Sequence, residues 1–199
     1  MAGIYLHIPF CRKACHYCNF HFSTQLGALD EMADTLIAES IIRKTEISEP
    51  IQTIYFGGGT PSLLHADKIE KILEAIKLHY TIDEDAEITL EANPDDISLE
   101  KAKTWRNIGI NRFSIGIQSF DEKNLIWMNR VHNAEQSHAC IDIIRDAGFE
   151  NFSIDLIYGS PGQSLSGWEA DVEMAISKKI PHLSCYALTI EGNITAPYD

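Results

Sequence analysis

The sequence predicts an α/β protein in which parallel strands are joined by helices. Six short runs rich in β-branched or aromatic residues have the length and composition of buried strands, at residues 4–8, 53–56, 87–91, 112–117, 152–157 and 183–188. The segments between them carry apolar residues at helical spacing. The 199 residues divided by six strands give about 33 residues for each strand and its helix. This spacing indicates parallel strands joined by right-handed crossovers, in a β/α barrel-like or doubly wound sheet.

Three connecting segments show the helical pattern most clearly. Their predicted buried faces are Ala33, Leu36, Ile37 and Ile41; Ile69, Ile72, Leu73, Ile76 and Tyr80; and Cys140, Ile143, Ile144 and Ala147. Asp67 and Ser98 precede helical segments, and Gly109 and Gly148 follow them, as start and stop residues do. We expect the acidic run 83–85 to be a solvated loop, and Cys140 and Cys185 to be buried apolar residues.

Composition and charge exclude several classes of protein. The chain is 45% hydrophobic and 23% charged, which is typical of a globular domain. Its 29 acidic and 16 basic residues give a net charge of −13, and no basic face is apparent, so nucleic acid is not the expected partner. No apolar run approaches the ~18 residues of a membrane span, and the first residues already resemble a strand rather than a leader peptide.

Three of the five cysteines, Cys11, Cys15 and Cys18, lie within eight residues after the first predicted strand. An odd number clustered in this way favours metal ligation in a reducing compartment, and we therefore expect a cytoplasmic protein. Three thiolates on one loop suit three corners of a [4Fe–4S] cluster and leave the fourth iron open to a substrate or cofactor. The alternative is a structural zinc site that His16 or His21 completes.

Polar and glycine residues follow the other predicted strands. They are Gly57, Gly58, Gly59 and Thr60 after the second, Glu91 after the third, Gln118 and then Arg130 after the fourth, and Asp155 within the fifth. Because the C-terminal ends of parallel strands meet at one rim, we expect these residues to converge. Carboxylates, an amide and a guanidinium suit a ligand with an amino acid group and a ribose. Taken singly, each has a structural alternative: a tight turn, an ion pair or a solvated loop.

The cysteine spacing Cys-x₃-Cys-x₂-Cys, with Tyr17 before the last cysteine, resembles the radical S-adenosylmethionine (SAM) superfamily. Further motifs resemble its oxygen-independent coproporphyrinogen III oxidase-like branch. They are Tyr-x-His-x-Pro-Phe-Cys, Gly-Gly-Gly-Thr-Pro, Glu-Ala-Asn-Pro, Ser-x-Gly-x-Gln-Ser-Phe, Arg-x-His and Pro-Gly-Gln, in order between residues 3 and 191.

This resemblance implies a partial (β/α)₆ TIM-like barrel with parallel strands and outer helices. Residues 1–199 are then one radical SAM core domain, truncated before the C-terminal domain of the family. The chain is also shorter than a complete eight-stranded barrel, which takes about 250 residues. It also implies a [4Fe–4S] cluster on Cys11, Cys15 and Cys18, with SAM on the open iron through its amine and carboxylate. The shared reaction reduces SAM by one electron to methionine and a 5′-deoxyadenosyl radical.

The resemblance assigns a SAM-binding role to further residues by motif position. Tyr5 is expected near the cluster and Tyr17 near the adenine, and Gly58, Gly59 and Thr60 are expected at the methionyl end. Glu91, Gln118, Arg130 and Asp155 are expected to hold the SAM carboxylate and ribose, or a second SAM.

Within this branch the residue two positions beyond the third cysteine separates two functions. Coproporphyrinogen III dehydrogenases, which decarboxylate two propionates oxidatively, carry a further cysteine there, whereas this chain has Phe20. We therefore expect a haem chaperone that binds haem and delivers it to apo-haemoproteins, with the dehydrogenase as the alternative and a zinc-bearing barrel without redox chemistry as the third. Whether the chain is an enzyme stays open.

Smaller departures from the branch pattern do not touch the cluster ligands. Asn19 stands where many members have Asp, Asn129 where a Gly often precedes the Arg, and Ser160 interrupts Gly-x-Pro-Gly-Gln. The expected partners are SAM, haem or a porphyrinogen, an apo-haemoprotein acceptor, and an electron donor such as flavodoxin or ferredoxin. Through the acceptor, the protein is expected to associate peripherally with a membrane.

Overall fold

The computed structural model describes residues 2–189 and contains one six-stranded parallel sheet. The strands are β1 (Ala2–Ile8), β2 (Ile51–Gly58), β3 (Ile82–Ala92), β4 (Arg112–Gln118), β5 (Phe152–Tyr158) and β6 (His182–Ala187). Each strand pairs in parallel with the next one along the chain, so the spatial order is the chain order. All six predicted strands are confirmed, and β1 and β6 remain edges of an open, partial barrel.

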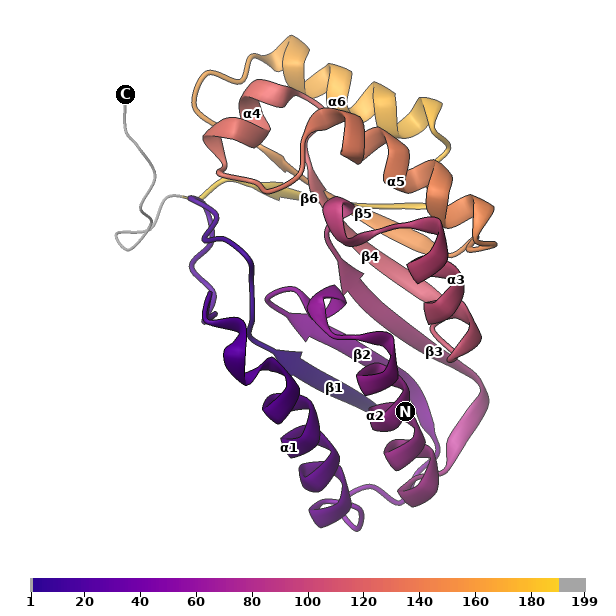
Figure 1. Ribbon diagram of the computed structural model, residues 1–199. Helices are drawn as coiled ribbons and strands as arrows, with labels where there is room; N and C mark the ends of the chain where they lie inside the picture. Colours follow the sequence, from indigo (N-terminus) through magenta and orange to yellow (C-terminus); the bar gives the residue numbers. More distant parts are fainter. Residues whose placement is uncertain (1, 190–199) are drawn as a thin grey trace.

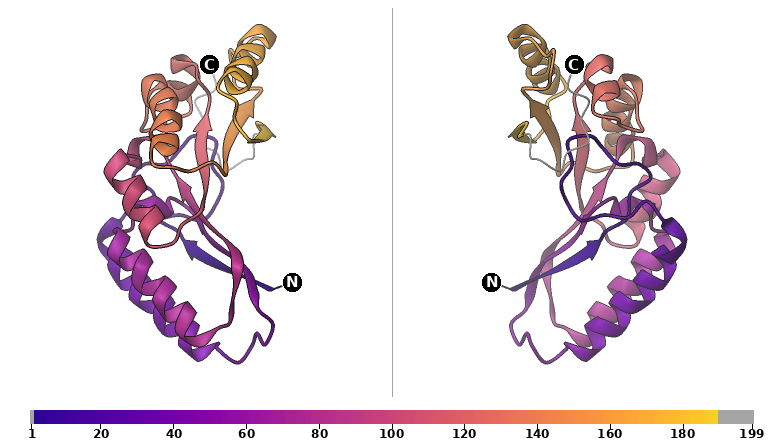
Figure 2. Two further views of the ribbon diagram at one scale, coloured as in Figure 1. Left: turned by 90° about the vertical axis from the view of Figure 1, so that its right-hand side faces the viewer. Right: turned by 90° about the vertical axis from the view of Figure 1, so that its left-hand side faces the viewer.

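Helices connect the strands and cover one face of the sheet. They are α1 (Leu29–Ile42), α2 (Ala66–His79), α3 (Leu99–Asn107), α4 (Glu122–Trp127), α5 (Ala134–Asp146) and α6 (Leu165–Ser177), with short 3₁₀ turns η1 (Leu26–Ala28), η2 (Pro61–Leu63) and η3 (Pro94–Asp96). Figures 1 and 2 show the longer helices along the outside of the curved sheet. Within residues 2–189, no helix has the length and apolar character that crossing a bilayer requires.

The strands alternate between an apolar outer face and a polar inner face. Outward residues such as Phe56, Leu90 and Phe113 are fully buried in the core beneath the helices. Inward residues of the central strands bond to one another instead: Arg112 donates to the hydroxyls of Thr89 and Ser153. Since side chains alternate along a strand, the same residues that build the core leave a polar inner surface that continues to the strand ends.

The predicted helix boundaries are confirmed at three positions. Ser98 is the N-cap of α3, and its hydroxyl accepts a hydrogen bond from the Lys101 amide. Gly109 and Gly148 follow α3 and α5 at φ +111° and +87°, a conformation that glycine adopts without a Cβ penalty.

Four expectations from the sequence are wrong. Residues 83–85 belong to β3, because Ile82 pairs with Ile51 and extends the strand through the acidic run. Asp67 lies inside the first turn of α2, whose N-cap is His65. Ile41 is 41% exposed, since burial along α1 is limited to Ala33 and Leu36. Cys185 is exposed because it lies on the edge strand β6, whereas Cys140 is buried as expected.

Two leucines of α2 provide a matched test of the core. Leu73 is 1% exposed and packs in the core, whereas Leu78 on the same helix is 78% exposed. We expect Leu73→Ala to lower the free energy of unfolding by about 2–5 kcal/mol, through lost burial and a cavity. Leu78→Ala should change it by less than about 0.5 kcal/mol. Urea unfolding measures both, and equal effects would contradict the described packing.

Candidate functional site

A cavity of about 550 Å³ lies at the C-terminal ends of the strands. Every predicted site residue except Tyr5 lines it: Cys11, Cys15, Tyr17, Cys18, Gly58, Gly59, Thr60, Glu91, Gln118, Arg130 and Asp155. These side chains come from the loops or ends of β1 to β5, which confirms that they converge. The parallel topology explains this, because all strands end at the same rim.

Tyr5 is the predicted site residue that does not line this cavity. Its hydroxyl is 3.1 Å from His7 Nδ1, and its ring stacks on Tyr55 with centroids 5.9 Å apart. It lines a second cavity of about 240 Å³ between β1 and α1. Its side chain lies on the inner face of β1 beside Tyr55, whose hydroxyl donates to the cavity residue Glu91.

The three cysteines lie on an irregular loop between β1 and η1. All are free and partly exposed, and the Cys11 and Cys18 amides donate to the carbonyls of Ser23 and Cys15. Burial raises the pKa of the Cys11 and Cys18 thiols, so a metal that binds them must displace their protons. These sulfurs share one cavity and are the strongest metal ligands in it.

The positions of the described side chains do not form a site for a single metal ion. Among residues 2–189, no group of three His, Cys, Asp or Glu side chains is placed to hold one metal ion. Around a zinc ion each sulfur would lie about 2.3 Å from the metal, whereas in a cubane cluster each thiolate binds its own iron. The zinc alternative therefore gains no support from these positions.

The glycine turn after β2 is tied to the cysteine loop. The Gly59 amide donates to Ile8 O at 2.9 Å, and the Thr60 amide donates to Phe10 O at 2.7 Å. A Cβ on Gly59 would lie 2.6 Å from Phe10 O and 2.9 Å from Cys11 Sγ, so no larger residue fits without movement. The Thr60 hydroxyl lies 3.6 Å from Cys11 Sγ and donates to it. Glycine at this position thus lets the turn pack directly against the cysteine loop beside the Cys11 thiol.

Three predicted residues present oriented polar groups to the cavity. Glu91 accepts from Tyr55 Oη at 2.7 Å and from the Gly58 amide at 3.1 Å, which fixes its carboxylate. Burial raises the pKa of both Glu91 and Asp155. Gln118 ends β4 at φ +68°, a strained conformation for a residue with a side chain. Strain of this kind clusters at functional sites.

Arg130 connects the cysteine loop to the strand ends. Its Nη1 lies 3.5 Å from Cys15 Sγ and 3.1 Å from Tyr17 Oη, and its Nη2 donates to Asn93 Oδ1 and Gly116 O, both at 2.7 Å. These four partners are a thiol, a phenol, an amide and a carbonyl, so the guanidinium charge is not cancelled by them. A buried Nε without a partner remains on the same side chain. The charge of Arg130 favours anionic groups nearby, and the carboxylates of Asp95 and Asp155 already lie within its influence.

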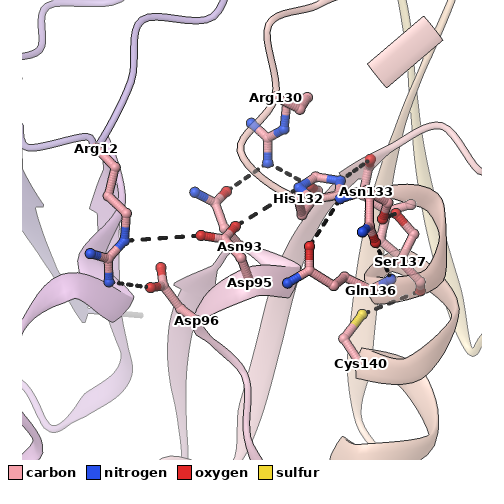
Figure 3. Close-up of polar contacts among 12 residues, drawn as sticks. Arg12, Asn93, Asp95, Asp96, Arg130, His132, Asn133, Gln136, Ser137 and Cys140 are labelled. Atoms are coloured by element: carbon pink, nitrogen blue, oxygen red, sulfur yellow. Dashed lines mark hydrogen bonds and ion pairs between the residues drawn. The ribbon is translucent and has the colours of Figure 1, made fainter. Parts of the chain in front are cut away.

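A second chain of polar contacts links the cysteine loop to η3 and the segment before α5 (Figure 3). Arg12 Nη2 donates to Asp96 Oδ1 at 2.8 Å, and Arg12 Nε is 3.9 Å from Asp95 Oδ2. Asp95 Oδ1 faces His132 Nδ1 at 4.0 Å, and neither atom has another partner. His132 Nε2 donates to Ile117 O at 3.1 Å.

These contacts set the protonation of His132. Burial, together with the charge of Arg130, lowers the pKa of His132 to about 3. Burial also raises the pKa of Asp95. The imidazole is therefore neutral near pH 7, with its proton on the nitrogen that bonds to Ile117.

Sequence reasoning missed several lining residues. Asn93 donates to Thr60 Oγ1 at 3.3 Å and accepts from Arg130, so it joins the glycine turn to the guanidinium. Ser114 and Gly116 line the cavity from the inner face of β4. Alternation along the strands could have identified Ser114, because it shares its face with Arg112. Asn93 stands within the Glu-Ala-Asn-Pro motif, but its role depends on contacts between distant segments.

The chain is similar to known proteins over most of its length. Residues 5–175 match the sequence profile of the Radical SAM superfamily. It is 38% identical over 194 residues to the haem chaperone HemW of Bacillus subtilis, covering 96% of this chain and 51% of that protein. It is 40% identical over 190 residues to HemW of Lactococcus lactis, covering 95% and 49%. The chain thus spans about half the length of these relatives.

A solved structure is similar as well. Coproporphyrinogen III oxidase (HemN) from Escherichia coli, described as a radical SAM enzyme, superimposes with a TM-score of 0.89 at 28% identity. The match covers 97% of this chain and 45% of that one. The partial barrel described above is therefore the fold of this relative.

Replacing His132 tests the buried network. Because the folded protein binds a proton at His132 far less readily than the unfolded chain, acid favours unfolding between pH 6.5 and 3. His132→Gln keeps a donor for Ile117 O but does not titrate. Between pH 7 and pH 5, the free energy of unfolding should fall by about 2 kcal/mol more in the unsubstituted protein than in this variant. Urea unfolding of the metal-free protein measures this, and parallel pH profiles would refute it.

Proposed function

The chain belongs to the radical SAM superfamily, and we propose that it is the cluster- and SAM-binding part of a haem chaperone of the HemW type. The observation that carries the proposal is the shared cavity, in which three cysteines of one loop lie beside the carboxylates, amide and guanidinium of the strand ends. The identity of 38–40% to two haem chaperones over nearly the whole chain supports the choice of function.

In this proposal Cys11, Cys15 and Cys18 hold a [4Fe–4S] cluster. Soft thiolates are the ligands that such clusters take. Gly59 allows the turn after β2 to approach Cys11 Sγ closely, and the Arg130 guanidinium lies beside Cys15 Sγ, where it would stabilise a thiolate ligand. The residues present therefore suit the group.

The remaining lining residues would bind SAM. Gly58, Gly59 and Thr60 would contact the methionyl end, Tyr17 would lie near the adenine, and Glu91, Gln118, Arg130 and Asp155 would hold the carboxylate and ribose, or a second SAM. The unpartnered Nε of Arg130 supports a carboxylate ligand, because a buried donor without an acceptor is costly. Tyr5 would lie near the cluster, and its stacking on Tyr55, which bonds to the cavity residue Glu91, supports this place.

When bound, cluster and SAM would supply one-electron reduction and radical chemistry. The protein would position the ligand and exclude water. Glu91 can hold its carboxylate rigid because Tyr55 and Gly58 both donate to it. Apolar side chains of Phe22, Ile157 and Leu188 line the same cavity and restrict water there.

The cavity mouth suits a flat apolar ligand with acidic groups. Phe20, Tyr186 and Val131 are 73%, 56% and 46% exposed and all line this one cavity, so they offer apolar surface to a ligand there. Lys13 lies at the same cavity and is a cation for an acidic group, next to Arg12, which is paired with Asp96, in a chain of net charge −13. Haem, with its apolar ring and two propionates, matches both features.

Coproporphyrinogen III dehydrogenase activity is the second candidate. The superposition on HemN favours it, whereas Phe20 at the position of the extra cysteine disfavours it. In the chaperone proposal an apo-haemoprotein receives the haem, a flavodoxin or ferredoxin supplies electrons, the acceptor brings the protein to a membrane surface, and the compartment is the cytoplasm.

Two cysteines test the cluster assignment. We expect the anaerobically reconstituted chain to hold about four irons and four sulfides. Cys15→Ala should lose them, whereas Cys185→Ala should keep them, because Cys185 lies on β6 and does not line the cavity. Iron and sulfide analysis measures this. Stoichiometric zinc without sulfide, or a full cluster in Cys15→Ala, would show that the assignment is wrong.

A competition between haem and coproporphyrinogen III tests the function. The chain extended over the full length of its relatives is expected to bind haem and to transfer it to an apo-haemoprotein, without decarboxylating coproporphyrinogen III under reducing conditions with SAM. Absorbance of the haem and chromatography of the porphyrins are the readouts. Formation of the divinyl product would overturn the chaperone proposal in favour of the dehydrogenase.

A further inference from the structure

We infer that His16 and Asn129 are positioning residues that hold the cysteine loop in the arrangement that receives the cluster. The inference rests on the proposed function, because it concerns the loop that would bind the cluster. Its basis is a set of contacts between residues 14–16 and the C-terminal end of α4, more than 110 positions apart in the chain.

The end of α4 has free carbonyl groups. The Asn129 amide donates to Ile126 O and the Arg130 amide donates to Leu125 O, the bond pattern of a Schellman helix end. That pattern leaves the next two carbonyls, of Trp127 and Met128, without a partner from the helix.

The cysteine loop fills these two acceptor positions. His16 Nδ1 donates to Trp127 O at 2.7 Å, and the His16 amide donates to Met128 O at 3.1 Å. His16 lies directly after Cys15, so capping the helix also holds the chain between Cys15 and Cys18. The imidazole tautomer follows from the geometry, because a carbonyl can only accept.

Asn129 adds a third bond in the opposite direction. Its Nδ2 donates to Ala14 O at 2.7 Å, one residue before Cys15. Its φ of +59° is the left-handed conformation, which glycine adopts most cheaply and Asn tolerates better than most residues. Asn129 therefore has two roles: its left-handed backbone ends the helix, and its short amide side chain donates to the loop.

Arg130, the next residue, also contacts the cysteine loop and connects it to the strand ends. Arg130 reaches Cys15 Sγ and Tyr17 Oη with one nitrogen and the β3 and β4 ends with the other. Residues 127–130 therefore touch residues 14–17 along their whole length. A ligand-bearing loop held in this way loses less conformational entropy when it binds its cluster.

Replacing Asn129 by glycine separates the effect of its side chain from the effect of its backbone conformation. Asn129→Gly keeps the left-handed residue and removes the donor, and Asn129→Asp keeps a tolerant backbone but presents an acceptor to Ala14 O. Lys179→Gly is the matched control, because Lys179 (φ +51°) follows α6 in the same Schellman pattern, away from the cysteine loop. His16→Ala removes the other donor, and His16→Asn is the rescue variant because it restores a short N–H donor.

Two measurements test the inference. In the anaerobic metal-free protein, hydrogen exchange of the amides at residues 15–18 should accelerate about 3- to 10-fold in Asn129→Gly, Asn129→Asp and His16→Ala, as expected for the loss of one hydrogen bond. In the reconstituted protein, iron release to a chelator should accelerate by a similar factor. Lys179→Gly should match the unsubstituted protein in both, and His16→Asn should recover most of the difference.

The outcomes separate the inference from the proposed function. If the unsubstituted chain takes up the cluster while Asn129→Gly and His16→Ala match it in exchange and iron release, the positioning role is overturned and the cluster assignment stands. If the unsubstituted chain takes up no cluster, the proposed function itself fails. Faster exchange and release in both variants, with Lys179→Gly unchanged, support the inference.

Discussion

The buried guanidinium of Arg130 is the interaction on which the site depends. A cation inside a protein must have its donors satisfied, and here the acceptors come from the cysteine loop, the β3 end and β4. Meeting that requirement brings three separate segments to one point. The groups bonded to the guanidinium are uncharged, so its charge can also act on thiolate ligands and a carboxylate-bearing cofactor, beside the carboxylates of Asp95 and Asp155.

The fold and most of the site residues could be predicted because local pattern and topology determine them. Runs such as residues 112–117 and 152–157 place aromatic and β-branched residues at alternate positions, so β4 and β5 are found within one residue. Parallel strands end at one rim, which places Glu91 and Gln118 in the same cavity as the cysteines. The approach of Gly59 to Cys11 follows from the same topology, since β1 and β2 are neighbours.

Contacts between distant segments could not be predicted. The bonds from Arg12 to Asp96 and from His16 to Trp127 join segments more than 80 residues apart, and no local pattern encodes which loop meets which helix end. Exposure at the edge of a sheet also depends on contacts that the local sequence does not encode. Cys185 stands at an apolar position of an alternating strand pattern, but it is exposed because β6 is an edge strand of the open sheet.

The central claim is that one cavity holds both a cluster with an open iron and SAM. The most direct measurement is the electron paramagnetic resonance spectrum of the reduced, reconstituted protein before and after adding SAM. Binding of SAM at the open iron should change the g-values of the cluster signal, with saturation as the SAM site fills. An intact cluster signal that is identical with and without saturating SAM would contradict the claim.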